Sequence, residues 1–310
     1  MKKATYVSEV MLVAVTVIWG LGFPITKLAV EAGFGANSVL FSRFLVAVCV
    51  MAAIYRRRLK RLDRRHIVFG AVTGVFLFLG FYFQTLGAIH TTPSKNAFIT
   101  QLNIVFVPFL AMLFSRIRVD KYNLVAVAVS LTGLYFISLH GVRFGDINIG
   151  DVFTFLCAVL VAFHVVLSSH WQKRHDLDPV VFVFVSMVSA MVLAGLFAPF
   201  ETWPALTFVH AWPLGFLGVF NTALGFSIQS VALKLSSATR VSLIVAMEGL
   251  FGAIGSVLII GEHLSTATVS GGLLVMAGIL ITEVSPVRRK MFARAKKEKS
   301  VSEETLRTPF

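Results

Sequence analysis

Long apolar runs separated by short polar segments make up most of the chain. A helix needs about 20 mostly apolar residues to cross a bilayer. Runs of about this length lie at residues 8–30, 38–55, 66–89, 95–115, 121–139, 149–171, 179–200, 209–233, 237–260 and 267–284. The segments between them are too short to hold a soluble domain. The pattern therefore predicts an all-α integral membrane protein with ten transmembrane helices.

The first apolar run follows Lys2 and Lys3, as the apolar region of a secretory signal peptide would. The run is long for such a peptide, no small-residue cleavage site follows it, and further apolar runs come after it. We therefore interpret residues 8–30 as a transmembrane helix.

The composition agrees with a chain that lies in lipid. Hydrophobic residues make up 57% of it and charged residues 14%, whereas soluble domains average about 45–50% and about 25%. The net charge of +13 lies in short clusters between the apolar runs, which argues against nucleic acid as a partner. Cys49 and Cys157 lie within apolar runs and indicate packing residues. The sequence therefore predicts neither a metal site nor a cofactor.

Lysine and arginine residues in the loops predict the orientation of the chain, because they gather on the cytoplasmic side. With the N-terminus inside, the inside segments hold Lys2, Lys3, the basic run 56–65, Arg116, Arg118, Lys121, Lys173, Arg174, Lys234, Arg240 and the basic tail 285–310. The outside segments hold little beyond Lys95 and Arg143. The asymmetry predicts cytoplasmic N- and C-termini in the inner cell membrane. The run 56–65 is then a topology signal, with binding to anionic lipid as the alternative.

The stretch LGFYFQ at 79–84 returns as LGFSIQ at 224–229, which is 145 residues later. The same shift aligns the chain with itself without a gap from about residue 70 to 137, so that the third to fifth spans correspond to the eighth to tenth. Because five helices form each repeat, the second repeat enters the membrane from the opposite side. The sequence therefore predicts two inverted five-helix repeats at 8–139 and 149–284. Transporters built in this way bind substrate near the midplane, between the halves.

Several local motifs resemble one known family. They are the pair Trp19-Gly20, Arg43 within SVLFSRFLVA, the small residues of the fourth and ninth spans, and GEHLS at 261–265. Together with the ten-span plan, these features resemble the EamA branch of the drug/metabolite transporter superfamily. The resemblance implies a five-helix unit that occurs twice and the export or exchange of small metabolites, amino acids among them. Phe163 and Met187 occupy the positions of Trp19 and Arg43 in the second half, so the halves have diverged.

Polar residues within the spans are the candidates for the site, because they are costly in lipid and usually face a cavity or a partner. Asn96, Thr100 and Asn103 share one face of the fourth span. The repeat pairs Asn103 with Glu248, which lies about 16 Å along its span at the usual rise per residue. Glu248 is therefore expected near mid-membrane, as a substrate or proton site. The alternative is a structural carboxylate bound by a neighbouring helix.

Other ionisable groups allow two interpretations each. His164 is a second proton carrier or a neutral histidine bonded between helices. Arg43 and Lys27 are expected to make the outer half of the cavity positive and to favour a substrate carboxylate, although Lys27 can also pair with Glu31 four residues on. For Lys95, and for Arg240 at its repeat position, extension of the side chain to the interface is a sufficient explanation, with a gating role as the alternative.

The remaining candidates concern helix packing and the walls of the cavity. Gln84 and Gln229 lie beside glycines, which favours helix packing over direct contact with a ligand. Trp19, Phe23, Phe81 and Phe226 are expected either to form aromatic walls or simply to pack. A stripe of small residues at Gly249, Gly252, Ala253 and Ser256 predicts that the fourth and ninth spans pack closely, and Pro108 predicts a bend in the fourth.

The sequence favours a secondary transporter that moves a small metabolite by alternating access. An intramembrane enzyme is the first alternative, but no metalloprotease motif and no serine nucleophile motif with its partners occurs. A channel or a sensory membrane protein is the second. The expected partners are a small-molecule substrate and the lipid bilayer, and a homodimer remains open.

Overall fold

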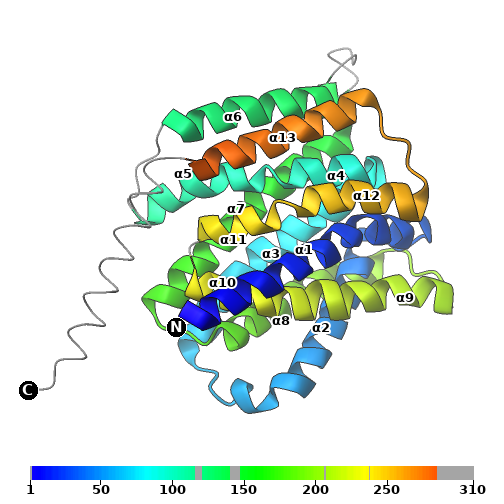
Figure 1. Ribbon diagram of the computed structural model, residues 1–310. Helices are drawn as coiled ribbons and strands as arrows, with labels where there is room; N and C mark the ends of the chain where they lie inside the picture. The colour runs from blue at the N-terminus through cyan, green and yellow to red at the C-terminus, as the bar shows by residue number, and fades with distance from the viewer. Residues whose placement is uncertain (1, 116–120, 140–146, 206, 237, 285–310) are drawn as a thin grey trace, which may run out of the picture.

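The computed structural model describes residues 2–115, 121–139, 147–205, 207–236 and 238–284, and every regular element in these ranges is a helix (Figure 1). The α-helices are α1 (Lys2–Glu31), α2 (Ala36–Leu59), α3 (Arg64–His90), α4 (Pro93–Thr100), α5 (Asn103–Ser115), α6 (Lys121–Leu134), α7 (Ile149–Arg174), α8 (Pro179–Phe197), α9 (Phe208–Phe216), α10 (Gly225–Leu235), α11 (Ala238–Val245), α12 (Glu248–Ile260) and α13 (Thr266–Val284). Two π-helices, η1 (Tyr135–Leu139) and η3 (Leu217–Leu224), and one 3₁₀-helix, η2 (Ala198–Phe200), continue them. The predicted tail 285–310, Arg116, Arg118, Arg143 and the side chains of Lys121 and Arg240 lie outside what is described.

The predicted apolar runs coincide closely with the helices. By length and composition, seven segments can cross a membrane: Val10–Glu31, Ala36–Leu59, Arg64–His90, Pro93–Phe114, Ile149–Arg174, Pro179–Phe200 and Phe208–Leu235. Three further apolar helices are shorter, at Leu124–Ser138, Glu248–Ile260 and Thr266–Ile281. The all-helical prediction is confirmed for the described residues, whereas the count of ten crossings stays a prediction.

The helices begin where short polar side chains take up free backbone N–H groups. Asp63 accepts from the backbone N of His66 at 2.9 Å and starts α3. Asp178 accepts from the backbone N of Val180 at 3.0 Å and starts α8. Proline follows Asp178 at the first helical position, where its missing N–H costs nothing. The two caps lie next to each other at one end of the bundle, since the backbone N of Asp178 donates to Nε2 of His66 at 3.0 Å.

Two of the predicted spans are each broken into two helices. The first break separates α4 from α5 at residues 101–102, and the second separates α11 from α12 at 246–247, so the breaks are related by the repeat shift of 145 residues. Pro108 lies within helix α5, after the first break, and the bend expected there stays a prediction. At the break, the side chain Nδ2 of Asn103 donates to the carbonyl of Thr100 at 2.8 Å. An amide side chain therefore takes a carbonyl that a continuing helix would have bonded to a backbone N–H.

Small residues bring the two broken spans together, as the sequence predicts. A Cβ atom added at Gly252 would lie 2.5 Å from the Cβ of Ala97, and one added at Gly249 would lie 2.9 Å from the Cγ of Gln101. Such separations are too short for a side chain, so α12 requires glycine where it crosses α4. Contact of this kind is typical of helix pairs in membranes.

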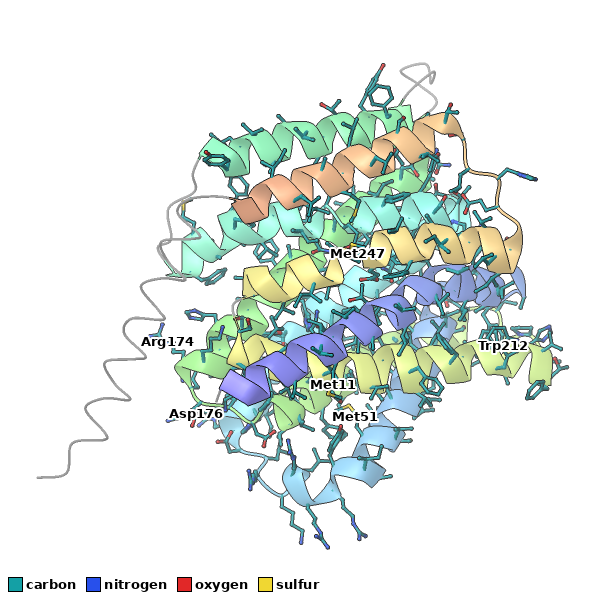
Figure 2. The ribbon with its side chains drawn as sticks, in the orientation of Figure 1. Met11, Met51, Arg174, Asp176, Trp212 and Met247 are labelled. Atoms are coloured by element: carbon teal, nitrogen blue, oxygen red, sulfur yellow. The ribbon has the colours of Figure 1, made fainter. Side chains whose placement is uncertain are left out.

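The helices form one elongated bundle. In Figure 1, α1 runs through its middle next to α12, while α6 and α13 lie side by side at one edge. Figure 2 places Arg174 and Asp176 at one end and Trp212 at the other. Large apolar side chains such as Leu113, Leu258 and Leu273 are 71%, 79% and 64% exposed. Their exposure on the outer surface of the bundle fits lipid as the surrounding solvent.

Candidate functional site

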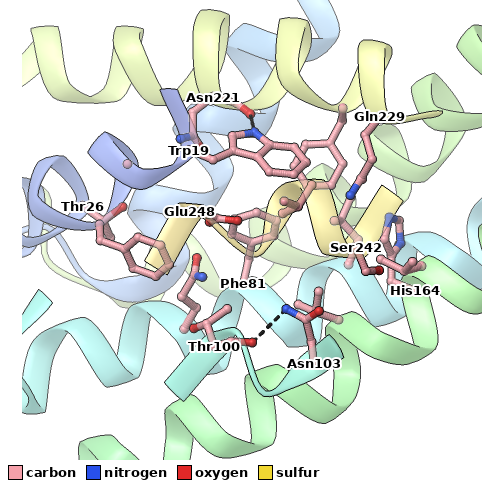
Figure 3. Close-up of a pocket in the computed structure, with 18 of the residues that line it drawn as sticks. Trp19, Thr26, Phe81, Thr100, Asn103, His164, Asn221, Gln229, Ser242 and Glu248 are labelled. Atoms are coloured by element: carbon pink, nitrogen blue, oxygen red, sulfur yellow. Dashed lines mark hydrogen bonds between the residues drawn. The ribbon is translucent and has the colours of Figure 1, made fainter. Parts of the chain in front are cut away.

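A cavity lies in the middle of the bundle, between α1, α2, α3, the α4–α5 break, α7, η3, α10 and the α11–α12 break (Figure 3). Its empty volume is about 700 Å³, counted with its opening. The sequence candidates among its lining residues are Trp19, Arg43, Gln84, Asn103, His164, Gln229 and Glu248. The polar residues that complete the lining are Thr26, Thr100, Asn221 and Ser242. Side chains from both sequence repeats therefore face one shared space.

Arg43 is the most completely bonded cation in this cavity. Its Nη2 donates to Oδ1 of Asn221 at 2.7 Å, and its Nε donates to Oγ1 of Thr222 at 3.0 Å. The guanidinium carbon lies 4.2 Å from the ring centroid of Phe81, a distance at which a cation and an aromatic face attract each other. No carboxylate among the described residues lies within 4 Å of Arg43. Its positive charge is therefore held in place but not neutralised.

Aromatic rings form one wall of the cavity. The rings of Trp19 and Phe226 are 5.0 Å apart, and those of Phe226 and Phe81 are 5.7 Å apart. The indole Nε1 of Trp19 donates to the backbone carbonyl of Asn221 at 2.6 Å, so the ring is fixed in orientation. A flat or apolar part of a ligand would contact this wall.

Glu248 is the first residue of α12 and follows the helix break directly. It is half-buried, faces the cavity, and makes no ion pair within 4 Å with any described cation, Arg43 included. The adjacent side chain of Gln101 is fully buried. The cavity thus contains an acid and a base that do not pair with each other.

His164 lies in the same cavity, near Gln229 and Ser242 (Figure 3). Its Nδ1 is 3.1 Å from the backbone carbonyl of Thr73. A carbonyl can only accept, so Nδ1 carries the hydrogen and Nε2 remains for a second contact. His164 therefore makes the hydrogen bond between helices that was one of its two interpretations from sequence, and it also faces the cavity.

Gln84 and Gln229 both line the cavity. No hydrogen bond joins either side-chain amide to another described residue, although the backbone carbonyl of Gln84 accepts from Asn96 at 2.8 Å. The sequence favoured a role in helix packing for the two glutamines, but the close packing is made by the neighbouring glycines. A Cβ added at Gly225, for example, would lie only 2.2 Å from Nε1 of Trp19. The two glutamine side chains are placed for the alternative, contact with a ligand.

Two of the sequence candidates lie away from the cavity. Asn96 is 1% exposed, and its amide holds the backbone of Gln84 from behind the cavity wall. Lys27 points to the end of α3, where its Nζ donates to the carbonyl of Ala88 at 2.8 Å and lies 3.8 Å from Glu31. The expectation that Lys27 makes the cavity positive therefore has no support, because the free carbonyls at the end of α3 bind this ammonium group.

Asn221 and Thr222 were not singled out from the sequence, although the side chains of both accept hydrogen bonds from Arg43. Both lie in the π-helix η3, within the apolar run 209–233. The signal was weak, since adjacent polar residues also occur in other predicted spans, as at Thr100-Gln101 and Ser168-Ser169. π-helical turns occur frequently at functional sites, but nothing local in the sequence marks this one.

Comparison with known proteins places these features in a family. The model of the EamA-like transporter family matches residues 7–139 and again residues 148–284. The chain therefore belongs to the EamA-like transporter family and is an integral membrane protein.

Several relatives are described only as uncharacterized transporters. One from Archaeoglobus fulgidus is 26% identical over 280 residues, covering 89% of this chain and 86% of the relative. YyaM of Bacillus subtilis is 23% identical, with 87% and 92% covered. One solved crystal structure is similar with a TM-score of 0.61 at 16% identity, over 90% of this chain and 98% of the other, which shows the fold alone.

Proposed function

We propose that this protein is a secondary transporter that moves a small zwitterionic metabolite, such as an amino acid, across the membrane by alternating access, in the direction of export. The proposal rests on one observation: Arg43 and Glu248 face a single cavity in the middle of the bundle without pairing with each other. A ligand with a carboxylate and an ammonium group would supply both missing partners. Buried charges that lack a partner are costly, so such a ligand would bind well.

An inverted repeat is supported by how the helices pack. The pairs α3 with α7, α5 with α7 and α3 with α8 have the counterparts α10 with α1, α12 with α1 and η3 with α2. The pair α4 with α12 has the counterpart α11 with α5, and the pair α6 with α13 corresponds to itself. In the last pair, a Cβ at Gly133 would lie 2.6 Å from the carbonyl of Gly271, and one at Gly278 would lie 2.8 Å from that of Ala126. These two contacts are related by the same shift of 145 residues, as expected for two halves that can exchange conformations.

Acidic residues of the second half bind the first half at one end of the bundle, which the Lys/Arg asymmetry assigns to the outside. Asp151 accepts from Oγ1 of Thr91 at 2.6 Å and lies 3.8 Å from Nζ of Lys95. Glu262 accepts from the backbone N of Ser94 at 3.2 Å and also from its hydroxyl, at the start of α4.

Glu201 makes the third such contact. Its carboxylate accepts from Nδ2 of Asn37 at 2.7 Å and from the backbone N of Ser38 at 2.9 Å, at the start of α2. A carboxylate at a helix N-terminus is favoured by the helix dipole. We infer that these three contacts form an outer gate, which must release before the cavity can open outwards.

The opposite end is held by a different set of groups. The backbone N of Asp178 donates to Nε2 of His66 at 3.0 Å, and Arg61, which is 74% exposed, lies 3.7 Å from the Asp178 carboxylate. The backbone N–H of His66, and then its side chain, hold the pKa of Asp63 below its ordinary value. An exposed ion pair contributes little to stability, so this end is expected to open more readily than the outer gate.

Glu262→Ala is expected to open the outer end. The substitution removes both bonds to Ser94, and each bond to a charged group is worth about 1.5–3 kcal/mol. In a background without Cys49 and Cys157, Thr26→Cys in the cavity should react several-fold faster with an impermeant thiol reagent added outside. Glu31→Ala, which removes an exposed carboxylate bound within the first half, is the matched control and should leave the rate unchanged. An equal rate in the Glu262 variant would contradict a gating role.

The orientation has a test of its own. Single cysteines placed in the segment 56–65 and in the tail 285–310 should be unreactive to an impermeant reagent in intact cells and reactive after permeabilisation, because lysine and arginine gather on the cytoplasmic side. A cysteine in the loop before α9 should react in intact cells. Labelling of the tail in intact cells would contradict the ten-span topology.

Reconstituted vesicles test the function directly. A transporter should show saturable counterflow, in which unlabelled amino acid inside accelerates the entry of labelled amino acid. Ohmic current would indicate a channel, and formation of a product would indicate an enzyme. The amino acids to load first are those that change most in abundance between cells that overproduce the protein and cells that lack it.

A further inference from the structure

The groups that hold Arg43 are all neutral. An amide oxygen, a hydroxyl oxygen and an aromatic face surround a guanidinium group that is 1% exposed. Buried arginines are more commonly satisfied by carboxylates, which bind the planar group with two parallel hydrogen bonds. Arg43 has no carboxylate within 4 Å among the described residues, and an ionisable residue inside a membrane protein is expected to serve a functional site.

The orientation of the Asn221 amide is fixed by its other contact. Its Nδ2 donates to the carbonyl of Ile18 at 3.2 Å, which leaves Oδ1 to accept from Arg43 at 2.7 Å. The backbone carbonyl of the same residue accepts from Trp19. One residue therefore fixes both the cation and the aromatic wall of the cavity.

The helices around Asn221 are shaped for this close approach. A Cβ added at Gly22 would lie 2.3 Å from Nδ2 of Asn221, and one added at Gly218 would lie 3.1 Å from the carbonyl of Arg43. Asn221 and Thr222 are consecutive residues of the π-helix η3, which packs against α2. Larger residues at either glycine would push the amide away from the guanidinium group.

We propose that Asn221 is a positioning residue that determines charge specificity: it holds Arg43 by a neutral acceptor, so that the carboxylate of the substrate supplies the missing negative charge. The inference rests on the proposed function, in which Arg43 faces the substrate. Aspartate at position 221 would have nearly the same shape, but it would neutralise Arg43 within the protein and would set a carboxylate oxygen against the carbonyl of Ile18. The affinity for carboxylates would then fall, while a cationic ligand near Glu248 would still bind.

The test uses the full-length protein in detergent, its thermal unfolding midpoint, and three probes with one ring each. Benzoate carries a carboxylate, benzamide is its neutral counterpart, and benzylamine carries an ammonium group. A ligand that binds only the folded state raises the midpoint. For the natural chain we expect a rise with benzoate and with benzylamine and a much smaller one with benzamide. For Asn221→Asp we expect the benzoate response to need at least tenfold more ligand, with the benzylamine response retained.

Two further variants make the result decisive. Asn148→Asp makes the same substitution at the N-cap of α7, away from the cavity, where Asp and Asn cap equally well, and it should respond to benzoate as the natural chain does. Thr222→Asp places the carboxylate at the Nε edge of Arg43 and should reproduce the selective loss, even if Asn221→Asp does not fold. An unchanged benzoate response in folded Asn221→Asp, or an equal loss of both responses, would overturn the inference and leave the proposed function standing. No benzoate response in the natural chain would overturn both.

Discussion

Arg43→Ala is expected to reduce transport of a carboxylate substrate at least tenfold at concentrations below saturation, with unchanged abundance in the membrane. The guanidinium group is the cation that lines the described cavity, and its bonds to Asn221 and Thr222 hold it there without neutralising it. Loss of a hydrogen bond to a charged group costs about 1.5–3 kcal/mol, which is about tenfold to a hundredfold in affinity. Because Arg43 makes no ion pair within 4 Å among the described residues, its removal breaks no salt bridge.

Arg43→Lys and Lys27→Ala are the informative controls. A lysine ammonium keeps the charge but lacks the planar fork that bonds Asn221 and Thr222 together, so Arg43→Lys should fall between the natural chain and Arg43→Ala. Lys27→Ala should leave the apparent affinity unchanged, because Lys27 binds the end of α3 outside the cavity. Initial rates of counterflow over a range of substrate concentrations measure all three. Normal affinity in Arg43→Ala would remove the carboxylate contact from the proposal.

The sequence predicts the positions of the helices well, because lipid imposes one simple requirement on each span. An apolar run needs no partner in order to be recognised, and the predicted run 121–139 coincides with α6 and η1. The break between α4 and α5 was not predictable in the same way. At this break, the side chain of Asn103 donates a hydrogen bond back to the carbonyl of Thr100. The sequence does not show which hydrogen bond a single asparagine will make, so it does not mark the break. Pro108 gives a stronger local signal, but it lies within α5, after the break.

The candidate site was predictable where a single residue was unusual in its surroundings. Glu248, Arg43 and His164 each stood out as ionisable groups in apolar runs, and all three line the cavity. Lys27 stood out for the same reason and points elsewhere, because its long side chain reaches the end of α3. The pairing of Arg43 with Asn221 joins residues 178 positions apart, and only the packing of α2 on η3 brings them together.

Glu248→Gln is expected to abolish transport driven by a pH gradient and to spare substrate exchange at equal pH. The carboxyl group faces the cavity, has no ion pair with the described residues, and can bind either a proton or the ammonium group of a substrate. Binding one then disfavours binding the other, which is the linkage that an antiporter needs. Glutamine keeps the shape and the hydrogen-bonding capacity of the side chain but cannot carry a proton between the two sides. Asn103, at the repeat position and on the same cavity, cannot replace it for the same reason, so we expect His164 to be the second proton station.

The measurement compares two fluxes in the same reconstituted vesicles. One is accumulation of labelled amino acid against its gradient after a pH jump, and the other is counterflow with equal pH on both sides. For Glu248→Gln we expect the first to fall to the level of vesicles without protein and the second to persist at a substantial fraction of the natural rate. Glu31→Gln removes an exposed carboxyl group outside the cavity and should leave both fluxes intact. Full pH-driven accumulation by Glu248→Gln would make Glu248 a packing residue and would place any proton coupling elsewhere. Loss of both fluxes in a stably inserted protein would instead assign Glu248 to substrate binding alone.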